Sequence, residues 1–191
     1  PEQPGQPDAG QLGSEPEQPS AAVMQPGYRE SEFDLDWVPR EAMTPAQRAE
    51  LADNCCGAFI DPTGAQRDPG SDPATSETTF NASEGLNQVS ENLITIVGPV
   101  VVRQGYRTVQ NNQSTSLDRS ENTVLMDGDV VFREPGMLIQ GSSAFMNGNS
   151  NDNRIENARY VIHDYGAHGS AEAIVYSGDT SLVTIENGEF S

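Results

Sequence analysis

Lysine is missing from this chain of 191 residues: all ten of its basic residues are arginines, and 29 acidic residues bring the formal charge to −19. Such an acidic chain is poorly suited to nucleic acid, because that binding depends on neutralising phosphates with cations. Long hydrophobic runs are also missing, so no segment reaches the roughly 20 apolar residues of a membrane-spanning helix. Since the chain starts at Pro1 without a signal sequence, we expect a processed or trimmed N-terminus and any membrane part outside this chain.

Cysteine and histidine are scarce, with two of each. Cys55 and Cys56 are neighbours, and Cα atoms about 3.8 Å apart are closer than a disulfide favours, so a bond between them would be strained. The residues leave open whether the thiols pair with partners outside this sequence, form a vicinal bond or stay free. His163 and His168 lack ligand spacing with the cysteines, so we expect no metal site and place both histidines on strand surfaces.

The first third of the chain has little with which to build a core. Residues 1–33, rich in Pro, Gln, Glu and Gly, predict a disordered tail, because too few apolar side chains offset the entropy of ordering. Residues 34–76 predict a short helix and a cysteine-containing linker. Thr44 is a capping residue followed by Pro45 at the first helical position, and the helix should end near residues 54–57.

Apolar and acidic residues alternate just ahead of this helix. Phe33, Leu35 and Trp37 alternate with Asp34 and Asp36, which suits a short extended segment laid on a surface. A merely adhesive contact of the tail explains the same pattern. After the helix, the Pro- and Gly-rich residues 61–73 are typical of a linker.

From about residue 77 the composition changes to runs of β-branched residues, and these runs repeat with a fixed period. The anchors Gly98, Gly128, Ala158 and Gly188 follow one another at equal spacing, and aliphatic and aromatic residues alternate with polar ones beside them. A second block repeats in step, with Gly136 opening one apolar run and Gly166 the next. We expect roughly three short strands of about 5–6 residues in each repeat.

Repeats this short must stack to share a core, so residues 77–191 predict an all-β domain, a jelly roll or open β-roll of stacked antiparallel repeats. Small inward residues such as Gly141, Gly169 and Ala171 leave either tightly closed sheets or unfilled space between the walls. Space lined by aliphatic side chains would suit an acyl chain, whereas an ordinary dry core explains the composition equally.

Several segments resemble the organic solvent tolerance (OstA, LptD) family of outer-membrane lipopolysaccharide-assembly proteins. Residues 98–109 (GPVVVRQGYRTV), 115–118 (TSLD) and 124–132 (VLMDGDVVF) are similar to the family's periplasmic repeat, although Leu117 replaces an aromatic residue. Residues 36–39 (DWVP) and 55–62 (CCGAFIDP) resemble the family's N-terminal region. The resemblance covers roughly residues 34–191.

The resemblance implies a periplasmic domain at the Gram-negative outer membrane that accepts lipopolysaccharide and passes it to a C-terminal transmembrane barrel absent from this chain. It implies as partners the lipid A acyl chains, a periplasmic bridge jelly roll joined through a strand edge, and the barrel with its lipoprotein plug. It also implies disulfides from Cys55 and Cys56 to cysteines in or near that barrel. The side chains expected to bind lipid are Val100, Val102, Leu125, Val130, Phe132, Ile139, Phe145, Ile155, Tyr160, Ile162, Val175, Ile185 and Phe190.

We expect no enzymatic activity, no catalytic residue and no cofactor. Asp127, Asp129 and Asp152 lie among Gly- and Asn-rich turns, where carboxylates commonly form the turn itself. The rival hypotheses are a ligand-free scaffold or adhesin and a polysaccharide-acting β-repeat enzyme, which needs two facing carboxylates. The arginines at 103, 107, 133, 154 and 159 are the cations able to pair with phosphate or carboxylate. We expect surface pairs with acidic neighbours, and their spacing leaves open whether one of them contacts a lipid phosphate.

Overall fold

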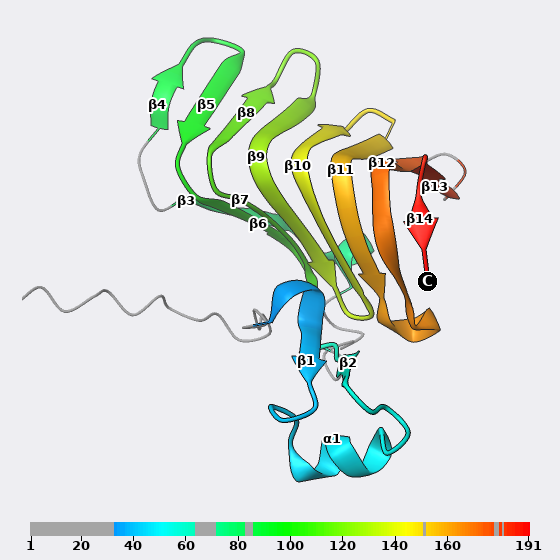
Figure 1. The fold of residues 1–191 in the computed structure, drawn as a ribbon. Coiled ribbons are helices and arrows are strands. Elements are labelled where there is room, and N and C mark those ends of the chain that lie inside the picture. The colour runs from blue at the N-terminus through cyan, green and yellow to red at the C-terminus, as the bar shows by residue number, and fades with distance from the viewer. Residues whose placement is uncertain (1–32, 64–71, 83–85, 151, 178–179, 181) are drawn as a thin grey trace, which may run out of the picture.

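In the computed structural model, residues 33–63, 72–82, 86–150, 152–177, 180 and 182–191 are described. A large antiparallel sheet dominates this part of the chain (Figure 1). The elements are η1 (Asp34–Asp36), β1 (Trp37–Pro39), α1 (Pro45–Glu50), β2 (Gly57–Phe59), η3 (Pro73–Thr75), β3 (Thr78–Ala82), β4 (Leu86–Val89), β5 (Leu93–Val97), β6 (Val100–Gln104), β7 (Arg107–Asn111), β8 (Ser114–Asp118), β9 (Thr123–Glu134), β10 (Met137–Asn147), β11 (Asp152–Ile162), η4 (His163–Tyr165), β12 (Ala167–Ser177), β13 (Leu182–Glu186) and β14 (Glu189–Phe190). Among the described helices, none is both long and apolar enough to span a membrane.

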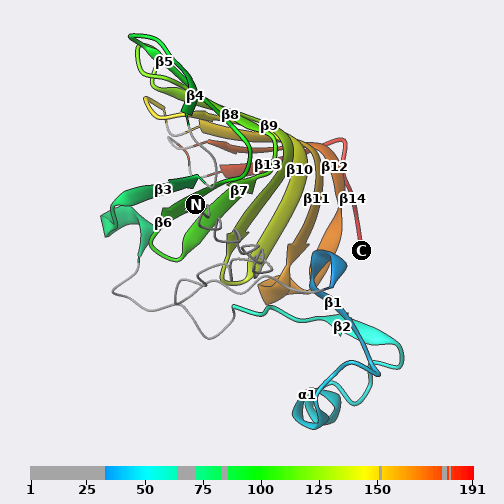
Figure 2. The same cartoon turned by 90° about the vertical axis from the view of Figure 1, so that its left-hand side faces the viewer.

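The sheet bends along its length into two walls. The first half of β9 pairs with β8 and its second half with β7, so one strand serves both walls. The upper wall, as we call it, contains β4, β5, β8 and β13. It also contains the half of β9 that pairs with β8 and the halves of β10–β12 aligned with it. The lower wall contains β3, β6, β7, the remaining halves of β9–β12, and β14. The two walls diverge from their shared bend (Figure 2), and the prediction of an all-β antiparallel roll is confirmed.

The repeat anchors mark the bend, which we call the crease. Gly98 and Gly128 have φ angles of 105° and 81°, and Asn157 and Asn187, each beside an anchor, have 48°. Left-handed backbone here suits Gly and Asn, which tolerate positive φ. The expected strand length holds for β3, β5–β8 and β13, with 5 residues each. It was wrong for β10, β11 and β12, which have 11 residues each because the chain crosses the crease without leaving the sheet.

A buried asparagine, Asn111, forms hydrogen bonds with the backbone at the crease, where β7 pairs with β9. The side-chain amide of Asn111 donates to the carbonyl oxygen of Asp127 at 3.0 Å and to that of Gly128. Its side-chain oxygen accepts from the Gln113 amide at 3.2 Å. These bonds satisfy backbone groups that the bend removes from the regular ladder.

Residues 33–63, which we call the strap, contact the outer face of the lower wall through η1 and residues 59–61, whereas α1 lies away from the sheet (Figure 1). Leu35 forms a small apolar cluster with Leu138 and Val161. The expected extended segment was wrong at this point: Leu35 and Asp36 have φ angles of 48° and 61° within the turn η1, and extended backbone begins only at Trp37. This turn brings the Asp36 carboxylate against the wall.

The start of the predicted helix is confirmed by a capping box, in which the Thr44 hydroxyl and the Gln47 side chain cap each other's backbone amides. Helix α1 ends at Glu50, earlier than expected, and Arg40 donates to the carbonyl of Asn54 at 2.6 Å just beyond it. The expected linker is partly anchored, because the Asp61 carboxylate accepts from the Gly136 amide at 2.7 Å. The predicted tail, residues 1–32 of it, lies outside the described residues.

Candidate functional site

The inner face of the roll carries rows of apolar side chains that cross its central strands. Cross-strand register aligns Val102, Val109, Phe132, Ile139 and Tyr160 in one row of the lower wall. In the upper wall another row aligns Met126, Ala144, Ile155, Ile174 and Ile185. Members of both rows belong to one core cluster, which places that core between the walls.

Most of the residues expected to bind lipid lie in these inner rows or in the row beside the crease. By register and core contacts they are Val100, Val102, Val130, Phe132, Ile139, Ile155, Tyr160, Ile162, Ile185 and Phe190. Burial varies along the depth of the roll: Val100 and Val130 near the crease are buried, whereas Val102, Phe132 and Ile162 are half-buried. The structure brings these side chains to one surface; lipid binding itself stays a prediction.

Leu125, Phe145 and Val175 were expected on this inner face, and the structure places them on the outer face instead. Leu125 and Phe145 are 50% and 42% exposed, and the register Leu125–Phe145–Arg154–Val175 aligns them beside a charged residue. For Phe145 the cause is the β-bulge between Gly141 and Ser143, which changes the side on which later residues of β10 point. A period-two pattern continued through the crease therefore selects the wrong face.

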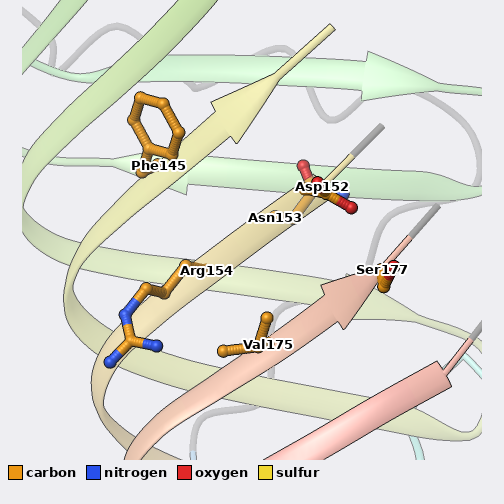
Figure 3. Close-up of a pocket in the computed structure, with 6 residues that line it drawn as sticks. All are labelled: Phe145, Asp152, Asn153, Arg154, Val175 and Ser177. Atoms are coloured by element: carbon orange, nitrogen blue, oxygen red, sulfur yellow. The ribbon is translucent and has the colours of Figure 1, made fainter. Parts of the chain in front are cut away.

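Figure 3 shows Phe145, Arg154 and Val175 on the same side of the sheet. They line a surface pocket with a volume of about 390 Å³, together with Asp152, Asn153 and Ser177. Arg154 is paired with Glu156 at 2.6 Å and Glu186 at 2.8 Å, and these carboxylates raise its pKa. Because the row of Phe145, Arg154 and Val175 lies on the outer face, this pocket is separate from the inner apolar surface.

The crease is closed rather than hollow. A Cβ added at Gly141 would overlap the side chain of Ile155, and one at the anchor Gly188 would overlap that of Ile185. In the lower wall, a Cβ at Gly169 would overlap the backbone of Glu189. The small residues thus admit close neighbours at the bottom of the roll, so a dry core describes the crease. Partly exposed apolar side chains begin only farther from the crease, at Val124 and Met146 of the upper wall and at Phe132 and Ile162 of the lower wall.

The apolar inner surface reaches both ends of the roll. At the β3 end, Phe80 belongs to the row of Val102 and is 54% exposed. At the opposite end, Ile185 and Phe190 extend the inner rows and are 39% and 82% exposed. Exposed apolar surface continuous with a core commonly marks an interaction site.

A buried ion pair attaches the strap to the outer face, and sequence reasoning missed it. Both terminal nitrogens of Arg133 donate to the Asp36 carboxylate at 2.8 Å, and His163 Nε2 lies 3.0 Å from the same group. Burial acts to raise the pKa of Asp36, but hydrogen bonds from His163 and Arg133 outweigh it and hold that pKa below its usual 3.8. Nearby, Asp34 pairs with Arg159 at 2.7 Å.

Two expectations about these residues need correction. Arg133 does not form a surface pair, since its side chain is only 4% exposed, and the His163 side chain is not on a strand surface but 8% exposed in η4. The reason is the strap, which covers this part of the wall. By contrast, Arg107 and Glu134 form the expected kind of pair, with their side chains 41% and 23% exposed.

The two cysteines are free and exposed at the base of β2. Their sulfur atoms are 2.8 Å apart, and the hydrogen bond with Cys55 raises the pKa of the Cys56 thiol. Pairing with cysteines elsewhere stays a prediction. Within the residues that the structure describes, no group of three metal-ligating side chains occurs.

No family model matches the chain. The chain is 31% identical over 157 residues to "LPS-assembly protein LptD" of Pseudomonas putida (strain GB-1) and 34% identical over 161 residues to the protein of that name from Pseudomonas entomophila (strain L48). These matches cover 82% and 81% of this chain but only 17% of each relative. A solved structure of LptH, described as the LptA homologous periplasmic component of the lipopolysaccharide transport device from Pseudomonas aeruginosa, is 18% identical; it covers 60% of this chain and 85% of that one, with a TM-score of 0.49.

Proposed function

Over 82% of its length the chain belongs to the family of the LPS-assembly protein LptD, and on this premise we propose that it is a periplasmic lipid-carrier domain of lipopolysaccharide transport. In this proposal the acyl chains of lipopolysaccharide lie between the walls and the sugar headgroup stays outside. No chemical step is involved, and the relatives are assembly proteins by name rather than enzymes. The chain spans about a sixth of the length of those relatives.

The observation that carries this proposal is the half-buried apolar band on the inner face. Val102, Phe132 and Ile162 of the lower wall and Val124 and Met146 of the upper wall contact the core on one side and keep partial exposure on the other. An acyl chain laid along them would gain about 25 cal/mol for each Å² of apolar area removed from water. The closed crease would form the floor of this path.

Open ends support movement along the roll rather than storage within it. Phe80 at one end and Phe190 at the other extend the inner rows and remain exposed. We propose that a neighbouring jelly roll covers the β3 and β4 end by strand addition and delivers lipid there. The β13 and β14 end would lead toward the transmembrane barrel and its lipoprotein plug, which places the domain at the periplasmic face of the outer membrane.

Site-specific photocrosslinking in Gram-negative cells tests the lipid path. In the longer protein that carries this domain, a photoreactive residue replaces Phe132, Ile162 or Met146, and the controls replace Leu125 and Phe145 on the same strands. We expect lipopolysaccharide adducts at the inner positions and none at the outer ones, because β9 and β10 turn these side chains to opposite faces. Equal capture on both faces would contradict the proposal.

A ligand-free scaffold is the second candidate, and the tight packing at Gly141 and Gly169 favours it. Mass spectrometry of organic extracts from the purified chain discriminates the two. Copurified glycolipid supports the carrier, whereas a lipid-free protein that also binds no added lipid A supports the scaffold. A polysaccharide-acting enzyme is disfavoured, because register places a single carboxylate, Glu134, in the inner rows of the described strands.

A further inference from the structure

Arg107 differs from the other arginines of the roll in the face that it occupies. It is the first residue of β7, at the edge of the lower wall farthest from the crease, and it pairs with Gln104 of β6. Its guanidinium lies 5.7 Å from the centre of the Phe132 ring and donates through Nε to Glu134 at 3.2 Å. Phe132 packs against the core between the walls, so Arg107 lies on the inner face at the mouth of the roll.

The remaining arginines in the described strands lie on the outer face. Arg103 aligns with Thr108 and the strap-bound Arg133. Arg154 aligns with the exposed Phe145, and Arg159 binds Asp34 of the strap. Within the strands that the structure describes, Arg107 is therefore the single arginine beside the apolar inner band.

The position of Arg107 matches the layout of a phosphorylated glycolipid. Such a lipid has acyl chains that prefer an apolar surface and phosphates that need a cation at the boundary with water. Phe132 belongs to the apolar band, and the guanidinium above it stands on the solvent side, with a side chain 41% exposed. Among the described residues, only Nε of this guanidinium has a hydrogen-bond partner, which leaves its terminal N–H groups to a ligand.

From this geometry we infer that Arg107 binds a phosphate of the lipid headgroup while the acyl chains lie between the walls. The inference rests on the proposed lipid-carrier function. It adds a protein residue that recognises the lipid headgroup, whereas the apolar band binds only the acyl chains. Guanidinium groups suit phosphate because their planar N–H pairs donate to two oxygens. Glu134 holds the side chain at the rim, and its negative charge limits the gain from the phosphate. A moderate affinity suits a ligand that must leave again.

Binding measurements on the purified chain test this with defined lipids. The probes are bisphosphorylated lipid A, monophosphorylated lipid A and fully dephosphorylated lipid A, each in the same detergent. We expect the unaltered chain to prefer the bisphosphorylated form over the dephosphorylated form by about tenfold, the equivalent of one charge-assisted hydrogen bond. Arg107→Gln should reduce this preference to near onefold without abolishing binding, and Arg107→Lys should restore part of it.

Arg103→Gln is the matched control, because it removes the same charge from the same hairpin on the opposite face. It should keep the full preference; an equal loss in both variants would show a general charge effect and overturn the inference. Equal binding of all three lipids by the unaltered chain would also overturn it, while leaving the carrier function intact. No binding of any lipid would instead refute the carrier function. Millimolar inorganic phosphate should not compete, and full competition would show a free-phosphate site rather than a headgroup contact.

Discussion

Arg133 on β9 and Asp36 in η1 are 97 residues apart in sequence and form a bidentate ion pair in which both N–O distances are 2.8 Å. The pair lies beneath the strap, with Asp36 fully buried and Arg133 almost so. It makes the strap an integral part of the folded domain, since each charge depends on the other for compensation.

Breaking the pair on one side should destabilise the domain strongly. Arg133→Leu leaves the Asp36 carboxylate buried without its main donor, and removal of one partner from a buried pair typically costs about 3–5 kcal/mol. We expect a loss of this size in the free energy of unfolding measured with urea. Arg159→Leu serves as the control: its pair with Asp34 is largely exposed, so the loss should be at most about 1 kcal/mol. Similar losses in both variants would contradict the assigned role.

The same carboxylate predicts a dependence of stability on pH. Asp36 titrates near 3.8 in the unfolded chain and below that value in the folded domain. The unfolded state therefore binds more protons as the pH falls through this range, so the contribution of Asp36 is complete above about pH 4 and lost below it. Urea titrations at pH 7 and pH 3 should show the difference between the unaltered chain and Asp36→Asn shrinking at the lower pH. A constant difference would mean that this carboxylate is not the titrating group.

Trimming from the N-terminus should change the melting temperature abruptly rather than gradually. Removal of residues 1–32 should leave it unchanged, because their composition offers no core. Removal of residues 1–36 also deletes Asp34, Leu35 and Asp36, and should lower the melting temperature by roughly 10 °C. Differential scanning calorimetry of the two shortened chains provides the measurement. A large drop after the shorter trim would show that the tail docks on the domain.

The sequence period predicted the roll because the crease imposes a local requirement. Gly98 and Gly128 recur where the backbone must adopt positive φ, and such a requirement is visible in composition. The face of Phe145 was not predictable in the same way, since the register irregularity between Gly141 and Ser143 reverses all later side chains of β10. The Asp36–Arg133 pair left no signal at all. Its partners are joined only by the fold, and an aspartate in an acidic N-terminal segment looks like any other.

The last prediction concerns the open edge at the β4 end of the roll. The Ser90 amide donates to the Leu93 carbonyl at 2.8 Å, where β4 turns into β5. Antiparallel ladders alternate the direction of successive N–H groups, so the amide of Val89 points away from β5 toward the free edge. Val89→Pro therefore removes a donor that an added strand would use and spares the β4–β5 ladder. Ile94→Pro would not isolate the free edge, because β5 is covered by β4 on one side and β8 on the other.

We expect Val89→Pro to abolish association with the periplasmic bridge jelly roll in a pull-down from envelope extracts, while circular dichroism shows an unchanged β-sheet content. Val183→Pro is the matched control on β13, the edge strand at the other end of the upper wall. It should keep the association, because the proposed bridge contact lies at the β3 and β4 end. If Val89→Pro binds normally and Val183→Pro does not, the roll is oriented the other way, and lipid would enter beside Phe190 rather than beside Phe80.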